Sequence, residues 1–455
     1  MDKLLFSVEQ CALMTNISEE VLRSTMDCII IDGKNYIDIN DINKCIINKK
    51  IKYRFSSVNI EHKNDVFASK REIPQNGYNV IDLFCGAGGS SSGFKLAGFS
   101  IIGALDINKI AAKTHELNFP ECKTIVGDIA TITPSEFHNM IGSRRVDIII
   151  GSPPCQTFSS LSQGKLKSLG KDVKLDIRNY YYKNYLDYVS YFKPKVFLME
   201  NVPGFMTKYK GEIFKDLLRY IRDELPEYDI KYSILESQKY SVPQSRSRLF
   251  VCGFRKGIDF DFPLSNNEFC ESLPYVTVQD AISDLPEITD DWRLDKLRYS
   301  NVVKNSYQKF MRHNNNDMVT NNICRISNPC AKELFQRLKP GERYSDLPQS
   351  IKDEIKLFDT FESSVIQGRC RRLPLNQVSW TIIAHIGMDG YEYIHPTKTR
   401  TLSVREAARI QSFTDDFIFV GNMREQYVQV GNAVPPLLSY AIAKRINISL
   451  SESNL

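Results

Sequence analysis

The sequence lacks the patterns of a membrane span and of an export signal. No apolar run reaches about eighteen residues, and the amino terminus has neither a long apolar centre nor a small-residue cleavage site. It also lacks any C-x-x-C pair, although eleven cysteines are scattered along the chain. This odd number and spacing argue against a disulfide framework and against a typical zinc site. We therefore expect a cytoplasmic protein that binds no metal ion.

A large excess of one charge is also missing. Lys and Arg number 59 against 54 Asp and Glu, so the net charge is +5. This balance permits a nucleic-acid partner but does not require one. At 455 residues, of which 42% are hydrophobic, the chain is long enough for two or three folded domains.

The pattern of apolar segments divides the chain into five parts. Residues 1–55 indicate a small unit in which Ser18 caps a helix, Asp32 and Gly33 turn a hairpin, and a further helix follows Asn40. The other parts are a polar linker at 56–76, a regular region at 77–255, an irregular insertion at 256–398 and a regular end at 399–455.

Region 77–255 alternates short apolar strands with helical patterns, which predicts parallel strands joined by crossover helices. The expected fold class is therefore α/β, with a doubly wound, mostly parallel, Rossmann-like sheet. The last two strand patterns, "YDIKYSILES" and "RLFVCGF", are too close for a crossover helix, so we expect an antiparallel pair at an edge. Region 256–398 loses this rhythm and is interpreted as a smaller inserted domain.

A Gly-rich turn in "VIDLFCGAGGSSSGF", residues 80–94, lies between the first strand of this region and a helix. Glycines allow the backbone to approach a ligand closely, and a helix amino terminus offers unpaired N–H groups. Asp106 and Asp128 end the next two strands, at the edge where parallel sheets bind ligands. The Gly-rich turn taken alone could simply be a tight turn. Together with the two carboxylates, it favours a site for an adenosine-containing cofactor.

Two phosphate-binding motifs are absent. The turn does not complete G-x-G-x-x-G, and the chain has no G-x-x-x-x-G-K-[ST]. A pyrophosphate or a nucleoside triphosphate is therefore unsupported. S-adenosylmethionine, which carries a sulfonium and no phosphate, fits the turn and its two carboxylates better.

Two further strand ends carry candidate catalytic side chains. Cys155 follows the apolar run "RVDIII" and Pro153-Pro154, whose fixed φ angles stiffen its approach. Glu200, in "MENVPG", follows the next strand, so both side chains could face one pocket. A thiolate and a carboxylic acid there suit attack on a ring whose nitrogen is protonated or hydrogen-bonded. Taken singly, Cys155 could be a buried thiol and Glu200 a helix cap or a surface acid.

Basic residues follow both of these positions. Arg246 and Arg248 alternate in "QSRSRLF", so they share one face of a strand. They could anchor the substrate or the carboxylates of the site. The alternative is that both are ordinary surface arginines in contact with solvent. The segment 161–174 contains lysines and glycines and is typical either of a mobile loop that contacts phosphate or of a solvated loop.

Taken together, "DLFCGAGG", "PPCQTFS", "ENVPG", "QSRSR", "REAARIQSF" and "GNAVPP" resemble the motifs of the DNA cytosine-5 methyltransferases of bacterial restriction-modification systems. They occur in that family's order, and 256–398 lies where the family places its target-recognition domain. The departures at Ser403 and Thr414 touch no catalytic role. The extra unit at 1–55 resembles an excisionase-type helix-turn-helix, although a dimerisation or packing module would also fit.

The resemblance implies a role for each matching position. Cys155 would attack carbon 6 of a flipped-out cytosine, Glu200 would engage its N3 and amino group, and a methyl group would pass from S-adenosylmethionine to carbon 5, leaving S-adenosylhomocysteine. The implied residues are Cys155, Glu200, Arg246 and Arg248 for catalysis; Phe84, Gly86, Gly88, Asp106, Ile107, Asp128, Ile129, Pro153, Asn432 and Val434 for the cofactor; and Gln156, Ser159, Lys165, Gln244, Arg369, Arg371 and Arg372 for DNA.

The resemblance also implies partners and leaves alternatives. Double-stranded DNA would be the substrate, a cognate restriction endonuclease the functional partner, and a monomer the default state. A transfer-RNA cytosine-5 methyltransferase and a DNA-binding transcriptional regulator acting through residues 1–55 are the alternatives. The recognition sequence does not follow from the residues, because no code maps side chains of 256–398 to bases.

Overall fold

A computed structural model describes residues 75–154, 180–265, 275–288, 295–299, 301–312, 317–355, 370–388 and 390–453, together with the backbone of three short strands near the amino terminus. By its internal contacts the chain divides into two compact units. One comprises Met1–Ala68 with Val420–Glu425, and the other comprises Ser69–Phe419 with Gln426–Leu455.

Three antiparallel strands are described in the first unit. They are β1 (Leu5–Ser7), β2 (Ile29–Ile31) and β3 (Lys34–Asp38), in the order β1-β3-β2. Strands β2 and β3 flank Asp32 and Gly33, which confirms the predicted hairpin. The helices predicted for this unit and residues 56–74 of the linker predicted at 56–76 lie outside the described residues, so the helix-turn-helix remains a prediction.

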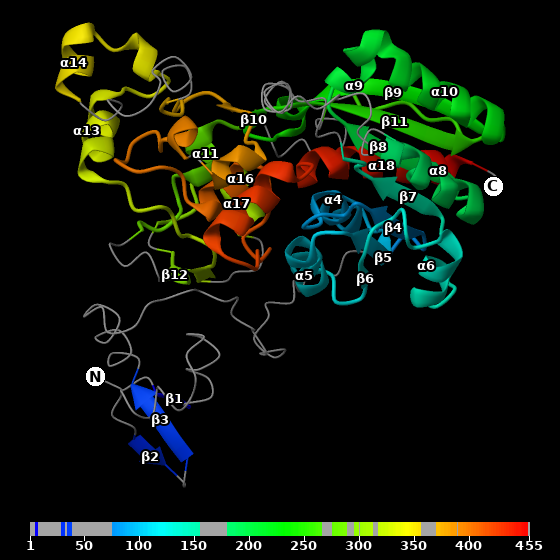
Figure 1. The fold of residues 1–455 in the computed structure, drawn as a ribbon, viewed down its shortest axis with the longest axis horizontal. Helices are drawn as coiled ribbons and strands as arrows, with labels where there is room; N and C mark the ends of the chain where they lie inside the picture. The colour runs from blue at the N-terminus through cyan, green and yellow to red at the C-terminus, as the bar shows by residue number, and fades with distance from the viewer. Residues whose placement is uncertain are drawn as a thin grey trace. The chain divides into compact units, whose positions relative to one another are not determined.

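The second unit is built on a seven-stranded sheet with the order β6-β5-β4-β7-β8-β11-β9 (Figure 1). The first five strands in this order are parallel, as the sequence predicts. Strand β11 is antiparallel to both neighbours, so β9 and β11 form the predicted antiparallel pair, with β9 at the edge itself. The strands are β4 (Asn79–Leu83), β5 (Ser100–Asp106), β6 (Lys123–Val126), β7 (Ile148–Gly151), β8 (Val196–Asn201), β9 (Tyr228–Glu236) and β11 (Ser247–Arg255).

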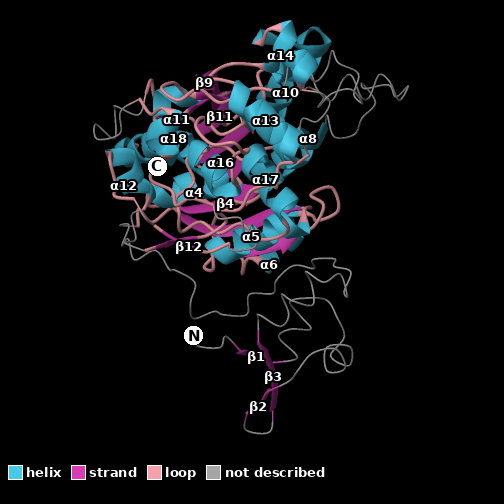
Figure 2. Cartoon of the chain, turned by 90° about the vertical axis from the view of Figure 1, so that its left-hand side faces the viewer, coloured by secondary structure: helices cyan, strands magenta, loops and turns pink. Residues whose placement is uncertain are grey.

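Helices cover both faces of this sheet, which is why its inner strands are continuous apolar runs (Figures 1 and 2). One face carries α4 (Gly89–Leu96), α5 (Lys109–Asn118) and α18 (Pro436–Glu452), and α18 packs directly on α4. The other face carries α6 (Pro134–Met140), α8 (Tyr181–Phe192) and α10 (Glu212–Glu224), with the short α9 (Gly204–Thr207) beside α10.

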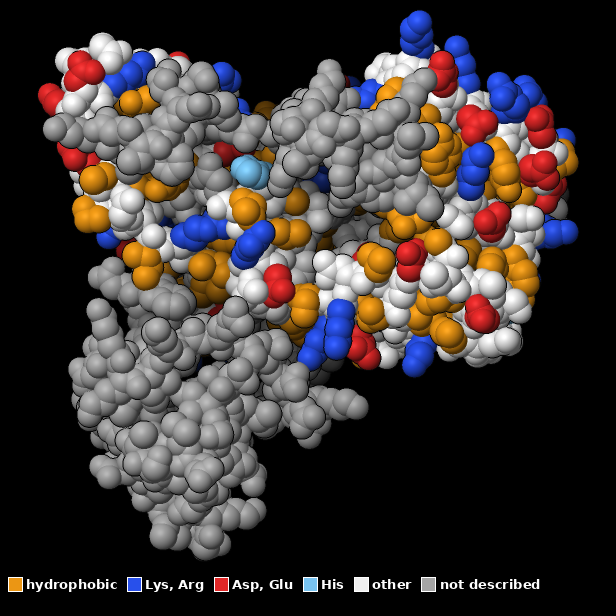
Figure 3. Space-filling model, in the orientation of Figure 1, with side chains coloured by type: hydrophobic (Ala, Val, Ile, Leu, Met, Phe, Trp, Pro, Cys, Tyr) orange, Lys and Arg blue, Asp and Glu red, His pale blue; other side chains and the backbone are white. Residues whose placement is uncertain are grey.

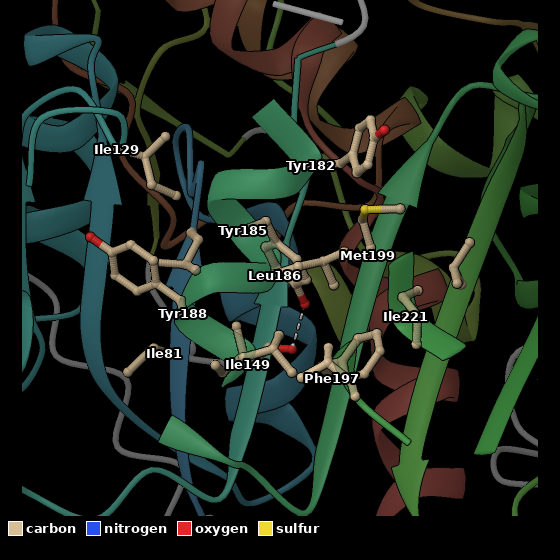
Figure 4. Close-up of a cluster of buried hydrophobic side chains, with 14 of the residues drawn as sticks. Ile81, Ile129, Ile149, Tyr182, Tyr185, Leu186, Tyr188, Phe197, Met199 and Ile221 are labelled. Carbon is tan, nitrogen blue, oxygen red and sulfur yellow. Dashed lines mark hydrogen bonds between the residues drawn. The ribbon is translucent and has the colours of Figure 1, made fainter. Parts of the chain in front are cut away.

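Tyrosines of α8 form much of the core between the sheet and this second group of helices. Tyr182, Tyr185 and Tyr188 are fully buried, and Figure 4 shows the Tyr185 hydroxyl directed at the backbone of β7. That hydroxyl donates to the carbonyl oxygens of Ile149, at 3.0 Å, and Leu198, at 3.1 Å. A buried phenol needs such partners, so these bonds fix α8 against two neighbouring strands.

The region after β11 has a core of its own. Ala331, Leu334, Phe335, Leu338 and Ile394 are among its fully or almost fully buried members. Its elements are short: α11 (Val278–Ile282), β12 (Leu297–Arg298), α12 (Ser306–Met311), β13 (Met318–Val319), α13 (Pro329–Arg337), α14 (Gln349–Glu354) and β14 (Ser379–Trp380).

Helix α16 (Val404–Ile410), which the sequence groups with the catalytic end of the chain, packs on α11 of the inserted region. Its Arg409 is fully buried and pairs with Asp284 at 3.0 Å and Asp415 at 2.6 Å. Removing Arg409 would leave these two buried carboxylates without their shared partner, a cost on the order of 3–5 kcal/mol. The predicted boundary at 399 therefore falls just before a helix that is packed into the inserted region.

Among the helices of the described ranges, none combines the length and apolar character that a membrane crossing requires.

Candidate active site

The carboxyl ends of the parallel strands meet along one edge of the sheet, and the predicted site residues follow them. Phe84 comes after β4, Asp106 ends β5, Asp128 follows β6, Pro153 follows β7 and Glu200 lies near the end of β8. This edge is where open α/β sheets bind their ligands.

The Gly-rich turn has the backbone geometry that its glycines permit. Gly86 has a φ of +53° and Gly88 a φ of +102°, which disfavour other residues, and Phe84 also has a positive φ of 62°. No heavy atom of the described residues lies within 4 Å of where a Cβ on Gly86 would stand. A Cβ on Gly88, by contrast, would lie 2.5 Å from the Phe119 ring. The turn is therefore packed at Gly88 and open at Gly86.

Asp106 faces this turn. The Gly86 N–H donates to its Oδ2 at 2.8 Å, and the Asn108 N–H donates to its Oδ1 at 2.7 Å. Burial raises the pKa of this carboxyl, and the two backbone hydrogen bonds oppose that shift. Each oxygen retains a lone pair that can accept a ribose hydroxyl. The next side chain, Ile107, is 68% exposed and offers an apolar surface for a planar base.

The second predicted carboxylate of the cofactor site, Asp128, and its neighbour Ile129 differ in burial. Asp128 is half-buried, and its Oδ1 accepts from the Ala130 N–H at 2.9 Å. Ile129 is buried in the hydrophobic core cluster, so its place in the cofactor site remains a prediction.

The carboxyl-terminal motif reaches the Gly-rich turn. A Cβ on Gly89, the first residue of α4, would lie 2.2 Å from the carbonyl oxygen of Val434. Farther along α4, a Cβ on Gly93 would lie 2.5 Å from the Cβ of Ser439. This close approach of two backbones fits the prediction that "GNAVPP" closes the cofactor site, although Asn432 itself is exposed.

Glu200 is paired with Arg248. Arg248 Nε lies 2.8 Å from Glu200 Oε1, and the two side chains are only 13% and 14% exposed. β11 runs beside β8, which brings the two residues together. The next residue, Asn201, donates from Nδ2 to the carbonyl oxygen of Pro153 at 3.4 Å. The Pro-Pro approach to Cys155 is thus tied to the strand end that carries Glu200.

Several predicted site residues lie outside the described residues. These are Cys155, Gln156, Ser159, Lys165 and Arg369, and the basic segment 161–174 lies outside them as well. Their predicted roles therefore remain predictions.

Gln244 and Arg246, predicted for DNA contact and for catalysis, both bond buried groups of the protein. Gln244 is fully buried, and its side chain bonds Gln411 and the backbone of Ile382, so it is not exposed to DNA. Arg246 is also buried, and it donates to the carbonyl oxygens of Ile382 at 2.7 Å, Ala433 at 3.0 Å and Gly431 at 3.2 Å. Its guanidinium holds the loops around the site, in contrast to Arg248, which faces Glu200.

The two described arginines of "GRCRR" also differ from the expectation of DNA contact. Arg372 is 4% exposed and donates to the backbone carbonyls of His395, Pro396, Lys398 and Phe335, so it serves the core of the inserted region. Arg371 pairs with Glu392 at 2.6 Å and stacks on the Trp380 ring at 3.8 Å.

Beneath the turn lies a buried polar chain that the sequence patterns did not indicate. The Ser91 hydroxyl donates to Asp82 Oδ2 at 2.6 Å and lies 3.0 Å from His115 Nε2, while His115 Nδ1 lies 2.8 Å from Thr124 Oγ1. Burial raises the pKa of Asp82 to about 7 and lowers that of His115 to about 3. Spacing could not reveal this chain, because its members come from four different elements.

Cys85, within the turn, is buried. Burial, followed by the nearby Asp106 and Asp82 carboxyls, holds the pKa of its thiol well above the usual range. Since a thiolate is the reactive form, Cys85 is unsuited to nucleophilic attack.

Known proteins match the chain over most of its length. The family model of the C-5 cytosine-specific DNA methylases matches residues 78–447. The type II methyltransferase M.DdeI of Desulfomicrobium norvegicum is 33% identical, over 83% of this chain and 90% of its own. M.AgeI of Thalassovita gelatinovora is 30% identical, over 82% of this chain and all of its own. M.Eco47II of Escherichia coli, also 30% identical, aligns with 99% of this chain and 97% of its own.

A solved structure agrees with these sequence relatives. The crystal structure of an E. coli prophage protein, described as a DNA modification methyltransferase, matches with a TM-score of 0.65 and 26% identity. The match covers 82% of this chain and all of the prophage protein. The chain therefore belongs to the C-5 cytosine-specific DNA methylase family, and it is a DNA (cytosine-5) methyltransferase of the type II restriction-modification kind.

Proposed function

We propose that this enzyme methylates carbon 5 of a flipped-out cytosine in one specific double-stranded DNA sequence, through a covalent bond between Cys155 and carbon 6. The observation that carries the proposal is the Arg248–Glu200 pair at the end of β8, because Asn201 ties this strand end to the segment leading to Cys155.

The residues at the carboxyl edge of the sheet fit S-adenosylmethionine. Open backbone at Gly86, the Asp106 carboxylate and the exposed Ile107 side chain suit a ribose and a planar base. When bound, this group supplies an electrophilic methyl on a sulfonium. Phe84 and Tyr181, whose rings are 6.1 Å apart, and the backbone of Val434 would border it.

Cytosine carbon 5 is a weak nucleophile within an aromatic ring, so the protein must first raise its electron density. The Cys155 thiolate forms a bond from Sγ to carbon 6, and the π electrons of the carbon 5–carbon 6 bond move toward carbon 5. Glu200 engages N3 and the exocyclic amino group of the ring, which stabilises the charge that develops on the ring as Cys155 adds. Arg248 orients the Glu200 carboxyl through the 2.8 Å contact.

Carbon 5 then accepts the methyl group, and S-adenosylhomocysteine leaves. A base removes the carbon 5 proton, the carbon 5–carbon 6 double bond re-forms, and the bond to Cys155 breaks to restore the thiolate. Stacked bases hide these atoms, so the cytosine must leave the helix, at a cost of a few kcal/mol.

The test is expression in cells without other cytosine methylation, followed by bisulfite sequencing. We expect 5-methylcytosine in one fixed sequence context, which would also define the recognition sequence. Its absence, with folded protein present, would overturn the proposal. A cognate restriction endonuclease is expected to cut the same sequence only in DNA from cells that lack the methyltransferase.

A further inference from the structure

A cavity lies at the end of the strands opposite to the end that carries Glu200 and Arg248. It has a volume of about 510 Å³, and Arg144, Arg145, Lys193, Lys195 and Arg255 supply its positive charges. We call this cavity the basic pocket.

The basic pocket and the active site lie at opposite ends of the same strands. Lys195 precedes the first residue of β8 and Arg255 is the last residue of β11, while Glu200 lies near the other end of β8. The Arg255 N–H donates to the Lys195 carbonyl at 2.9 Å, which joins the two strands at this edge. With a rise of about 3.3 Å per residue, the two edges are roughly 15 Å apart along β8. A ligand in the basic pocket cannot reach the flipped cytosine.

The pocket is strongly positive. Five Lys and Arg residues line it against one carboxylate, Asp147, whereas the whole chain has 59 Lys and Arg against 54 Asp and Glu. Asp147 is already engaged by Arg145, at 3.0 Å, and by the N–H of Asn79, at 3.0 Å. Figure 3 shows acidic and basic side chains interspersed over the described part of one face of the molecule.

Backbone carbonyl oxygens hold two of these guanidinium groups, and neither group forms an ion pair with a described residue. Arg144 donates to the carbonyl oxygens of Ile102 at 2.7 Å and Ile141 at 3.0 Å, and Arg255 donates to the carbonyl oxygen of Lys193. A carbonyl oxygen orients a guanidinium but carries no net charge. Guanidinium donors held in this way are suited to phosphate, which has a complementary geometry.

An aromatic surface lies beside the cations. Tyr191 is 46% exposed and lines the pocket with His138 and Phe192. The His138 ring packs edge-on against Phe192 at 4.9 Å, and its Nδ1 lies 3.3 Å from the Tyr191 hydroxyl. These contacts hold Tyr191 where its ring could stack on a planar group.

The volume of the pocket limits the size of the phosphate-bearing ligand that it can enclose. A volume of about 510 Å³ lies within the range for small molecules, roughly 300–1,000 Å³, and is too small to enclose a DNA duplex. We propose that the basic pocket binds a small phosphorylated ligand of the nucleotide class, with its phosphates on the cations and its base near Tyr191.

Calorimetric titration of the full-length enzyme with ADP tests this proposal. Saturating S-adenosylhomocysteine is included so that ADP cannot occupy the adenosine site. We expect one ADP per chain, displacement of ADP by inorganic pyrophosphate, and no binding of adenosine. Failure of ADP to bind, or binding of adenosine as tight as that of ADP, would overturn the proposal.

Variants then locate the site. Lys193→Gln and Arg144→Gln should each weaken ADP binding about fivefold to tenfold, the loss expected for one charged contact in a partly open site. Lys332→Gln, at an exposed lysine on α13, is the matched control and should bind ADP as the wild type does. Methyl transfer should be unchanged in all three, which shows that they are folded. Equal weakening in Lys332→Gln and Lys193→Gln would show nonspecific attraction and contradict the proposal.

Discussion

Arg248 and Glu200 form a nearly buried ion pair, with Nε and Oε1 2.8 Å apart, at the end of strand β8. The pair joins a parallel strand to the antiparallel β11, so its geometry depends on the register between them. The proposed mechanism uses this carboxyl to engage the flipped-out cytosine.

The ion pair gives the first prediction. Glu200→Gln should lower the rate of methyl transfer by about 10²–10⁴, because the carboxyl group that engages N3 of the ring is lost. Arg248→Lys keeps the charge but loses the fixed guanidinium geometry, so we expect a smaller loss, about tenfold. Single-turnover kinetics measure both effects. Arg219→Lys, at an exposed arginine on α10, is the control, and a wild-type rate in Glu200→Gln would contradict the mechanism.

The choice between two cysteines gives the second prediction. Cys155→Ser should abolish both methyl transfer and covalent trapping on DNA containing 5-fluorocytosine, because a hydroxyl is a far weaker nucleophile than a thiolate. Cys85→Ala should leave both largely intact, since the Cys85 thiol is buried and its pKa is raised well above the usual range. Gel electrophoresis under denaturing conditions detects the trapped complex. The reverse pattern would overturn the assignment of Cys155.

The contact between α4 and the carboxyl-terminal motif gives the third prediction. Gly89→Ala places a Cβ 2.2 Å from the Val434 carbonyl oxygen, so backbone must move. We expect a loss of roughly 1–3 kcal/mol in the free energy of unfolding, as for overpacking in a core, and weaker binding of S-adenosylmethionine. Urea denaturation and equilibrium binding measure these changes. Ser90→Ala, at the next residue of α4, should change stability by less than about 0.5 kcal/mol.

Asp82 gives the fourth prediction, which concerns pH. Its pKa is about 7 in the folded protein against 3.8 as the ordinary value, so the folded state holds the proton more tightly. Stability is therefore lost as the pH rises from about 4 to about 7. Asp82→Asn removes this loss. The difference in free energy of unfolding, variant minus wild type, should therefore be more favourable to the variant at pH 8 than at pH 5, by roughly 3 kcal/mol.

Urea denaturation at the two pH values checks this. Asp216→Asn is the control, because the pKa of Asp216 is lowered in the folded protein whereas that of Asp82 is raised. The Tyr182 hydroxyl lowers the pKa of Asp216, so its contribution is present above the unfolded pKa and constant between pH 5 and pH 8. Asp216→Asn should destabilise the protein equally at both. If Asp82→Asn also shows no change with pH, the burial argument for Asp82 is wrong.

Local patterns in the sequence determined the fold class and the positions of the strand ends. Alternation of apolar strands with helices predicted the parallel sheet, and the short link before "RLFVCGF" predicted the antiparallel pair. These inferences succeed because they depend on local sequence. A strand buried on both faces is a continuous apolar run, and the length of a connection is read directly from the chain. The Gly-rich turn and Asp106 follow for the same reason, and Gly86 and Asp106 do meet at 2.8 Å.

Only the tertiary structure decided what each side chain contacts. Arg246 and Arg248 look equivalent in "QSRSR", yet one bonds three backbone carbonyls and the other pairs with Glu200. Gln244 and Arg372 have the polar character of DNA contacts, but they satisfy buried backbone groups instead. Polarity can be read from residue type, whereas the partner lies in another segment, from 23 residues away for Arg372 and His395 to 185 for Arg246 and Gly431. The sequence by itself therefore determined the sheet and its ligand-binding edge, and tertiary packing decided which polar side chains face the reaction.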